Sequence, residues 1–190
     1  MTPRVSGDST GWERESRIIA HNIVVRSLAP GRTQGTLRCG NLVLPCALGR
    51  GGITSRKREG DGATPRGVYR LESGYFRPDR HRRPQTALRL AATQRDGGWC
   101  DAADDRNYNC FVRHPYPESA ERLWRDDGLY DVVLVIGYNR RPRRRGAGSA
   151  IFMHVAKDGY APTEGCIALA YADLLKVLAR IGPATRLIVV

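Results

Sequence analysis

Ser149-Ala-Ile-Phe-Met-His154 and Thr163-Glu-Gly-Cys166-Ile-Ala-Leu169 are two short apolar runs that a polar loop separates. Each run predicts a β-strand with one reactive side chain at its edge. His154 and Cys166 are twelve positions apart, so a strand, a tight connection and a second strand place them side by side. An imidazole favours ionisation of a nearby thiol, and Gly165 allows a close backbone approach. The segment therefore predicts a cysteine nucleophile with a histidine partner.

The rest of the chain predicts a β-rich fold, mainly β with one or two helices, arranged as a single-domain sandwich or partial barrel. The apolar spacing of 171–181, followed by Gly182-Pro183, predicts a helix. A hairpin is expected over 36–48 with Gly40-Asn41 as its turn. We expect 1–16 to be a mobile tail and 17–190 to be one catalytic domain, with irregular loops at 49–65 and 96–117. Further strands are predicted at 18–28, 67–76, 86–92, 130–138, 150–155 and 186–190.

The charge balance is strongly basic, with a net charge of +12, and 28 of the 31 basic residues are arginine. Arginine binds carboxylates and phosphates through its planar fork, so an anionic peptide or a nucleic acid fits as partner. The densest run, Arg140-Arg-Pro-Arg-Arg-Arg145, is equally compatible with a solvated loop. No apolar run has the roughly 18–20 residues that a transmembrane helix needs, and the polar start lacks the apolar segment of a signal peptide.

Five cysteines are present, so at least one is unpaired in a monomer, and their spacing indicates no zinc site. Cys39 and Cys46 lie in apolar sequence and are expected to be buried thiols. Cys100 and Cys110 flank a polar loop and are able to pair in an oxidising compartment. Only Cys166 has catalytic surroundings.

Three motifs, in this order, resemble those of the L,D-transpeptidases of the YkuD type, which remodel bacterial peptidoglycan through a cysteine. Gly60-Asp-Gly-Ala-Thr-Pro-Arg-Gly-Val-Tyr69 is similar to their G-x-x-x-T-P-x-G-x-[YF] element. Ser149–His154 resembles the strand with the family histidine, and Thr163–Ile167 resembles the [ST]-H-G-C-[IV] signature. Trp99-Cys-Asp101 with Tyr108-Asn109 is similar to one branch of the family. The resemblance covers roughly 18–190.

The resemblance implies a thioester on Cys166, acid–base catalysis by His154 and an oxyanion hole that includes the backbone of Gly165. A backbone carbonyl or Ser149 would orient the imidazole. No metal or other cofactor is expected. The partners implied are donor and acceptor stem peptides, with no nucleic acid, and the protein is expected to be a monomer. The substrate indicates the periplasm or cell envelope, whereas the polar start leaves a cytoplasmic location open.

Two positions depart from the family pattern, because Glu164 replaces histidine and Ala168 replaces arginine. The missing arginine leaves the contact with the donor carboxylate to another residue, for which Arg66 and Arg113 are candidates. The candidate substrate-binding residues are Arg66, Trp99, Asp101, Tyr108, Asn109, Arg113, Thr163 and Glu164. A role in packing within the loop is an equal alternative for Trp99, Asp101, Tyr108 and Asn109. For Glu164, the equal alternative is a solvent-exposed position without a role in binding.

Two other functions are compatible with the sequence. An L,D-carboxypeptidase would release the same thioester with water. A basic nucleic-acid-binding module would use the arginines, but the aromatic residues do not alternate with them as a stacking surface requires.

Overall fold

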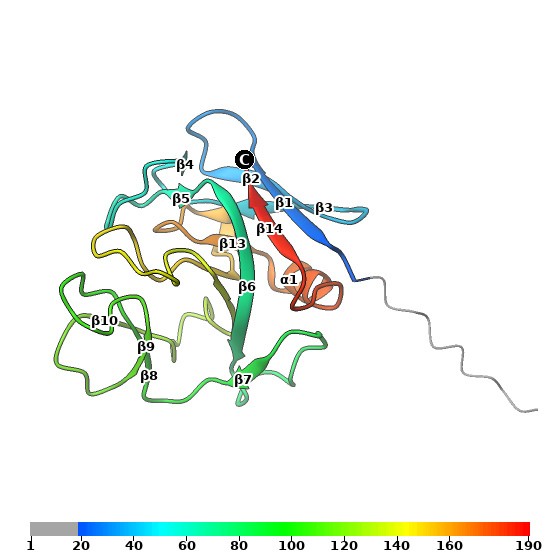
Figure 1. The fold of residues 1–190 in the computed structure, drawn as a ribbon. Helices are drawn as coiled ribbons and strands as arrows, with labels where there is room; N and C mark the ends of the chain where they lie inside the picture. The colour runs from blue at the N-terminus through cyan, green and yellow to red at the C-terminus, as the bar shows by residue number, and fades with distance from the viewer. Residues whose placement is uncertain (1–18) are drawn as a thin grey trace, which may run out of the picture.

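The computed structural model describes residues 19–190 and is dominated by β-strands with one α-helix (Figure 1). The predicted tail at 1–16 lies outside the described residues. The helix is α1 (Tyr171–Leu178), and η1 (Asp158–Tyr160) is a single 3-10 turn. The strands are β1 (Asn22–Ser27), β2 (Gln34–Cys39), β3 (Leu42–Ala47), β4 (Ile53–Thr54), β5 (Thr64–Pro65), β6 (Gly67–Phe76), β7 (Leu90–Ala92), β8 (Gly97–Cys100), β9 (Phe111–Arg113), β10 (Ala120–Arg122), β11 (Val132–Ile136), β12 (Phe152–Val155), β13 (Ile167–Leu169) and β14 (Arg186–Val189).

The main sheet closes on itself as a barrel. Its strand order is β11-β12-β13-β3-β2-β1-β14-β6-β7, and β11 also pairs with β6. The long strand β6 makes this closure, because Gly67–Arg70 pairs with β14 and Leu71–Phe76 pairs with β11. The predicted β-rich class is confirmed, and of the two predicted architectures the barrel is the one observed.

The larger hydrophobic core fills the barrel. Alternate residues of every strand in the ring enter it, as the two-residue period of a strand requires. Helix α1 adds Leu174, Val177 and Leu178 to the same core. The helix ends at Leu178 rather than at the predicted Ile181, and a turn continues the chain to Gly182-Pro183.

A second core lies on the outer face of β11 and β12. Val132, Leu134 and Ile136 point into the barrel, whereas Val133 and Val135 contact Trp99, Leu123, Tyr130 and Phe152. A small antiparallel sheet of β10, β8 and β9 covers this second core. The prediction that 96–117 is irregular was therefore wrong, because Gly97–Cys100 and Phe111–Arg113 form strands. Both strands are short, and Gly97 and Gly98 hide the alternating pattern of β8.

The strand β6 and the hairpin with its Gly40-Asn41 turn agree with the predictions, whereas the segment 86–92 forms a strand only at Leu90–Ala92.

The connection after β12 differs from the expected tight turn. β12 and β13 are parallel neighbours, so 156–166 must carry the chain back along the length of β12. The two reactive side chains therefore come from adjacent parallel strands rather than from a hairpin.

Candidate active site

The register of β12 and β13 places the predicted nucleophile and base on one face. Met153 pairs with Ile167, and His154 pairs with Ala168. Because side chains alternate along a strand, Phe152, His154, Cys166 and Ala168 share the face outside the barrel. Their neighbours Met153 and Ile167 lie in the barrel core.

The turn before Cys166 is fixed by its own hydrogen bonds. The Thr163 hydroxyl donates to the Cys166 carbonyl oxygen (2.7 Å) and accepts the Gly165 N–H (3.2 Å). Gly165 has a φ of 122°, and a Cβ there would lie 2.7 Å from the carbonyl oxygen of Ala63. Only glycine fits this position without displacing backbone. The Gly165 N–H would have to leave the Thr163 hydroxyl in order to serve an oxyanion.

Cys166 lies at the bottom of a cavity, and the residue is 7% exposed. Its thiol donates to the Ala150 carbonyl oxygen at 3.3 Å, and the Phe152 N–H contacts the sulfur at 3.3 Å. Burial raises the pKa of this thiol to about 12, and the Glu121 carboxylate acts in the same direction. The resting Cys166 side chain is therefore a neutral thiol.

His154 is held in one tautomer by its own strand. Its Nδ1 lies 2.8 Å from the Val155 carbonyl oxygen, and because a carbonyl only accepts, Nδ1 carries the proton. The Nε2 atom is then unprotonated and able to accept a proton from a thiol. Burial lowers the pKa of His154 to about 4, so the imidazole is neutral at pH 7. The ring also packs edge-on against Tyr130, with centroids 5.3 Å apart.

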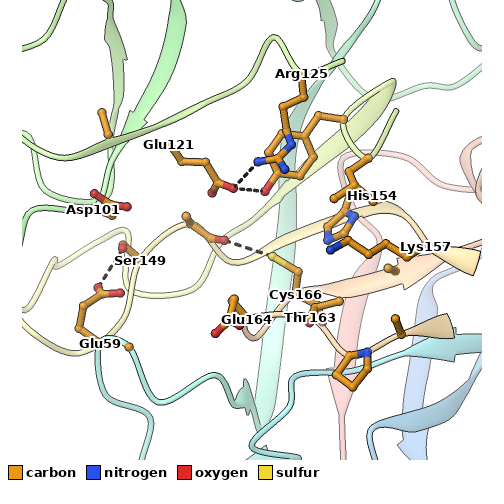
Figure 2. A pocket seen from close by; sticks show the side chains of 18 residues that line it. Glu59, Asp101, Glu121, Arg125, Ser149, His154, Lys157, Thr163, Glu164 and Cys166 are labelled. Carbon is orange, nitrogen blue, oxygen red and sulfur yellow. Dashed lines mark hydrogen bonds and ion pairs between the residues drawn. The ribbon is translucent and has the colours of Figure 1, made fainter. Parts of the chain in front are cut away.

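The cavity in front of these two residues has a volume of about 540 Å³ and carries charges of both signs. Figure 2 shows Glu59, Asp101 and Glu121 on one side of the sulfur and His154 with Lys157 on the other. Tyr130 donates to Glu121 at 2.7 Å, which fixes that carboxylate near the thiol. A ligand with both a cationic and an anionic group matches this distribution.

A family model for the YkuD L,D-transpeptidase catalytic domain matches residues 25–189. The chain belongs to the L,D-transpeptidase family. Comparison with curated proteins and with solved structures found no significant match. The family supports a general role in peptidoglycan metabolism and an enzymatic function. No helix among residues 19–190 is long and apolar enough to cross a membrane. In the same residues, no three His, Cys, Asp or Glu side chains are grouped as metal ligands.

Three of the predicted substrate-binding residues line the cavity, namely Asp101, Thr163 and Glu164. Glu164, which replaces the family histidine, forms an ion pair with Arg50 at 2.7 Å. The pair is exposed and joins the nucleophile turn to the loop after β3, where Gly49 also bridges to Thr163.

Three other predicted residues are buried and do not line the cavity, namely Trp99, Tyr108 and Asn109. The Asn109 amide oxygen accepts the Trp99 indole N–H (2.9 Å) and the Ala150 N–H (3.2 Å). The Tyr108 hydroxyl accepts the Gly148 N–H. These residues hold the segment before β12, whose Ala150 carbonyl accepts the Cys166 thiol.

The two arginines proposed for the donor carboxylate lie elsewhere. Arg66 is exposed beside β6, and Arg113 on β9 pairs with Asp96 at 2.6 Å. Neither lines the cavity, which contains the cations Arg125 and Lys157 instead. No sequence pattern indicated Arg125 or Lys157, because both are isolated in a chain with many basic residues. Glu59 and Glu121 were also missed, because only the folding of the chain brings them to the cavity.

Proposed function

We propose that this protein is a cysteine acyltransferase that cross-links peptidoglycan stem peptides by L,D-transpeptidation in the cell envelope. The observation that carries the proposal is the position of Cys166 and His154. They lie on one face of two parallel strands and open into one cavity. The family match supports the same substrate class.

In the first step, the Cys166 sulfur attacks the carbonyl of the L-centre of diaminopimelate in the donor stem. The thiol proton moves to His154 Nε2 and then to the nitrogen of the departing D-amino acid, so the peptide bond breaks and a thioester remains. In the second step, an amine of the acceptor stem attacks the thioester. His154 takes the amine proton and returns it to the sulfur, which restores the neutral pair.

The neutral resting pair suits this sequence of proton transfers. Because burial keeps both the thiol and the imidazole uncharged, the proton leaves sulfur only as the carbon–sulfur bond forms. The developing oxyanion needs backbone N–H donors near Cys166. One such donor is typically worth about 100–1,000-fold in rate.

We propose that Lys157 binds the donor carboxylate in place of the missing family arginine. Arg125 is already neutralised, since it pairs with Asp127 at 2.5 Å and lies 3.6 Å from Glu121. Lys157 is exposed at the cavity wall and makes no salt bridge within residues 19–190. A cation without a salt-bridge partner among residues 19–190 therefore lies on the His154 side, where a carboxylate would be attracted.

Intact-protein mass spectrometry tests the nucleophile. After exposure to a tetrapeptide stem or a carbapenem, we expect a covalent adduct on wild-type protein and none on Cys166→Ser. Wild-type protein that is folded and never acylates would overturn the mechanism.

Lys157→Gln should raise KM for the stem by about tenfold with little change in kcat, whereas Lys176→Gln, a distant matched control, should change neither.

The products of the reaction separate transfer from hydrolysis. Tetrapeptide stems should give cross-linked dimers, whereas trimmed tripeptides alone would make the protein an L,D-carboxypeptidase.

The nucleic-acid alternative loses part of its basis, because Arg140 contacts Glu72 and the Trp99 ring, and Arg143 donates to the Tyr108 carbonyl. A gel shift with a steep salt dependence would favour that alternative.

A further inference from the structure

Cys100 and Cys110 lie opposite each other in the backbone pairing at the closed end of the β8–β9 hairpin, and neither lines the active-site cavity. The Cys100 N–H donates to the Cys110 carbonyl oxygen (2.9 Å), and the Asn109 N–H donates to the Cys100 carbonyl oxygen (2.8 Å). Asn109 has a positive φ of 55°, so Asn109 and Cys110 together oppose Cys100 as a β-bulge. Residues paired in this way have α-carbons about 5–6 Å apart, which is within the range that a disulfide spans. Both side chains are free thiols.

The two sulfurs have different surroundings. Cys110 is partly exposed, and two guanidinium groups contact its sulfur, that of Arg143 at 2.7 Å and that of Arg140 at 3.7 Å. Both guanidinium groups are placed to donate to the negative charge that develops on this sulfur as it attacks an oxidant. Cys100 is fully buried, and burial raises the pKa of its thiol. One thiol is therefore accessible and contacted by two cations, and the other is sheltered beside it.

We propose that Cys110 and Cys100 form a redox-active dithiol that a hydroperoxide oxidises to a disulfide. The Cys110 sulfur attacks one peroxide oxygen, the O–O bond breaks, and hydroxide leaves with the thiol proton as water. Cys110 is now a sulfenic acid. The Cys100 sulfur then attacks the Cys110 sulfur, a second water leaves, and the S–S bond forms. Two thiols and one hydrogen peroxide give one disulfide and two waters.

The disulfide would close the loop Asp101–Asn109, which is connected to the catalytic centre. Asp101 lines the cavity, and Asn109 accepts the N–H of Ala150, whose carbonyl accepts the Cys166 thiol. Oxidation would fix this wall of the cavity without involving the nucleophile. Disulfide formation does not require the proposed acyl transfer, so the two proposals are tested separately.

Hydrogen peroxide on the full-length protein tests the proposal. We expect a mass loss of about 2 Da that a reductant reverses, as two hydrogens are removed. Trypsin cleaves after Arg106, so the Cys100 peptide (residues 96–106) and the Cys110 peptide (residues 107–113) should be recovered as one linked species. The same link should form in Cys166→Ala, because the nucleophile takes no part. Links to Cys39 or Cys46, or Cys110 oxidised to a sulfinic acid without a link, would overturn the proposal.

Matched variants separate activation from mere proximity. Cys110→Ser should abolish the mass loss, whereas Cys46→Ser should retain it. Arg143→Ala should slow disulfide formation by about three- to tenfold, since it removes a cation from the attacking sulfur. Arg144→Ala is the control, because Arg144 forms its hydrogen bonds with Asn139 through backbone atoms, which the substitution keeps. Equal rates in the two arginine variants, with native circular dichroism in both, would contradict the assigned role of Arg143.

Discussion

The two faces of β12 and β13 differ although they belong to the same residue runs. The inner face, with Met153, Ile167 and Leu169, is apolar and lies wholly in the barrel core. The outer face, with His154, Cys166 and Ala168, lines the cavity. The two-residue period of a strand assigns one set to packing and the other to chemistry.

This separation teaches that stability and reactivity should respond to different substitutions in adjacent positions. An inner-face change removes packed volume and lowers the free energy of unfolding. An outer-face change alters a group that borders an open cavity, so the barrel loses little packing. Neighbouring positions on one strand therefore provide matched tests.

Cys166→Ala should give the largest effect on the reactive face. We expect acylation by a stem peptide to fall by at least about 1,000-fold, or about 4 kcal/mol in the activation barrier, because the nucleophile is gone. The free energy of unfolding should change by only about 1 kcal/mol, since one sulfur atom is lost. Intact mass and urea unfolding measure the two quantities. Residual acylation at the wild-type rate would place the nucleophile elsewhere.

Met153→Ala should show the reverse. Met153 is fully buried in the barrel core, and truncation of such a side chain costs about 2–5 kcal/mol. Acylation per folded molecule should stay within about threefold of wild type, because His154 and Cys166 keep their face. Urea unfolding and acylation kinetics on the same sample test this. A loss of activity as large as that of Cys166→Ala would break the separation of the two faces.

Much of the fold was predictable because its signals are local. The strand 67–76, the hairpin turn at Gly40-Asn41 and the helix that begins at Tyr171 depend on alternation, turn chemistry and helical spacing. Barrel closure was not predictable, because it depends on β6 pairing with both β14 and β11, which are distant in sequence. The small β8–β10 sheet was missed because its strands have only three or four residues.

The candidate site divides in the same way. Cys166, Gly165 and His154 lie in short motifs, so sequence alone indicated them. Arg125 and Lys157 reach the cavity through tertiary folding, and no spacing relates them to Cys166. The choice between cavity and packing roles for Trp99 and Asn109 also required the structure. Tryptophan and asparagine occur both at binding sites and in packed interiors, and here only their burial distinguishes the two roles.

A pH titration of stability should give a smaller effect, which comes from the outer face alone. His154 has a pKa of about 4 in the folded protein against 6.5 as its ordinary value, so the unfolded chain binds the proton first. Stability from this group is present above pH 6.5 and is lost as the pH falls toward 4. Between pH 7 and pH 5 the loss should be about 2 kcal/mol, measured by urea unfolding.

His154→Gln is the control for that titration, because glutamine does not titrate. Glu121 has a raised pKa through burial and changes stability in the opposite sense, but it is present in both proteins and cancels in the difference. Equal pH dependence in wild type and His154→Gln would mean that His154 is not buried as a neutral ring.

Glu164→Gln should have the smallest effect, because its ion pair with Arg50 is exposed and such pairs contribute about 0–1 kcal/mol. The change in the free energy of unfolding should be under about 1 kcal/mol. Burial is the main cause of the raised pKa of Cys166, and the Glu121 and Glu164 carboxylates act in the same direction. Removing the Glu164 charge should therefore speed acylation slightly, by about two- to threefold. Arg50→Gln breaks the same ion pair but keeps the carboxylate, so it should leave the rate unchanged or lower. If both variants slow acylation equally, the pair acts by holding the nucleophile turn, and the outer face depends on packing after all.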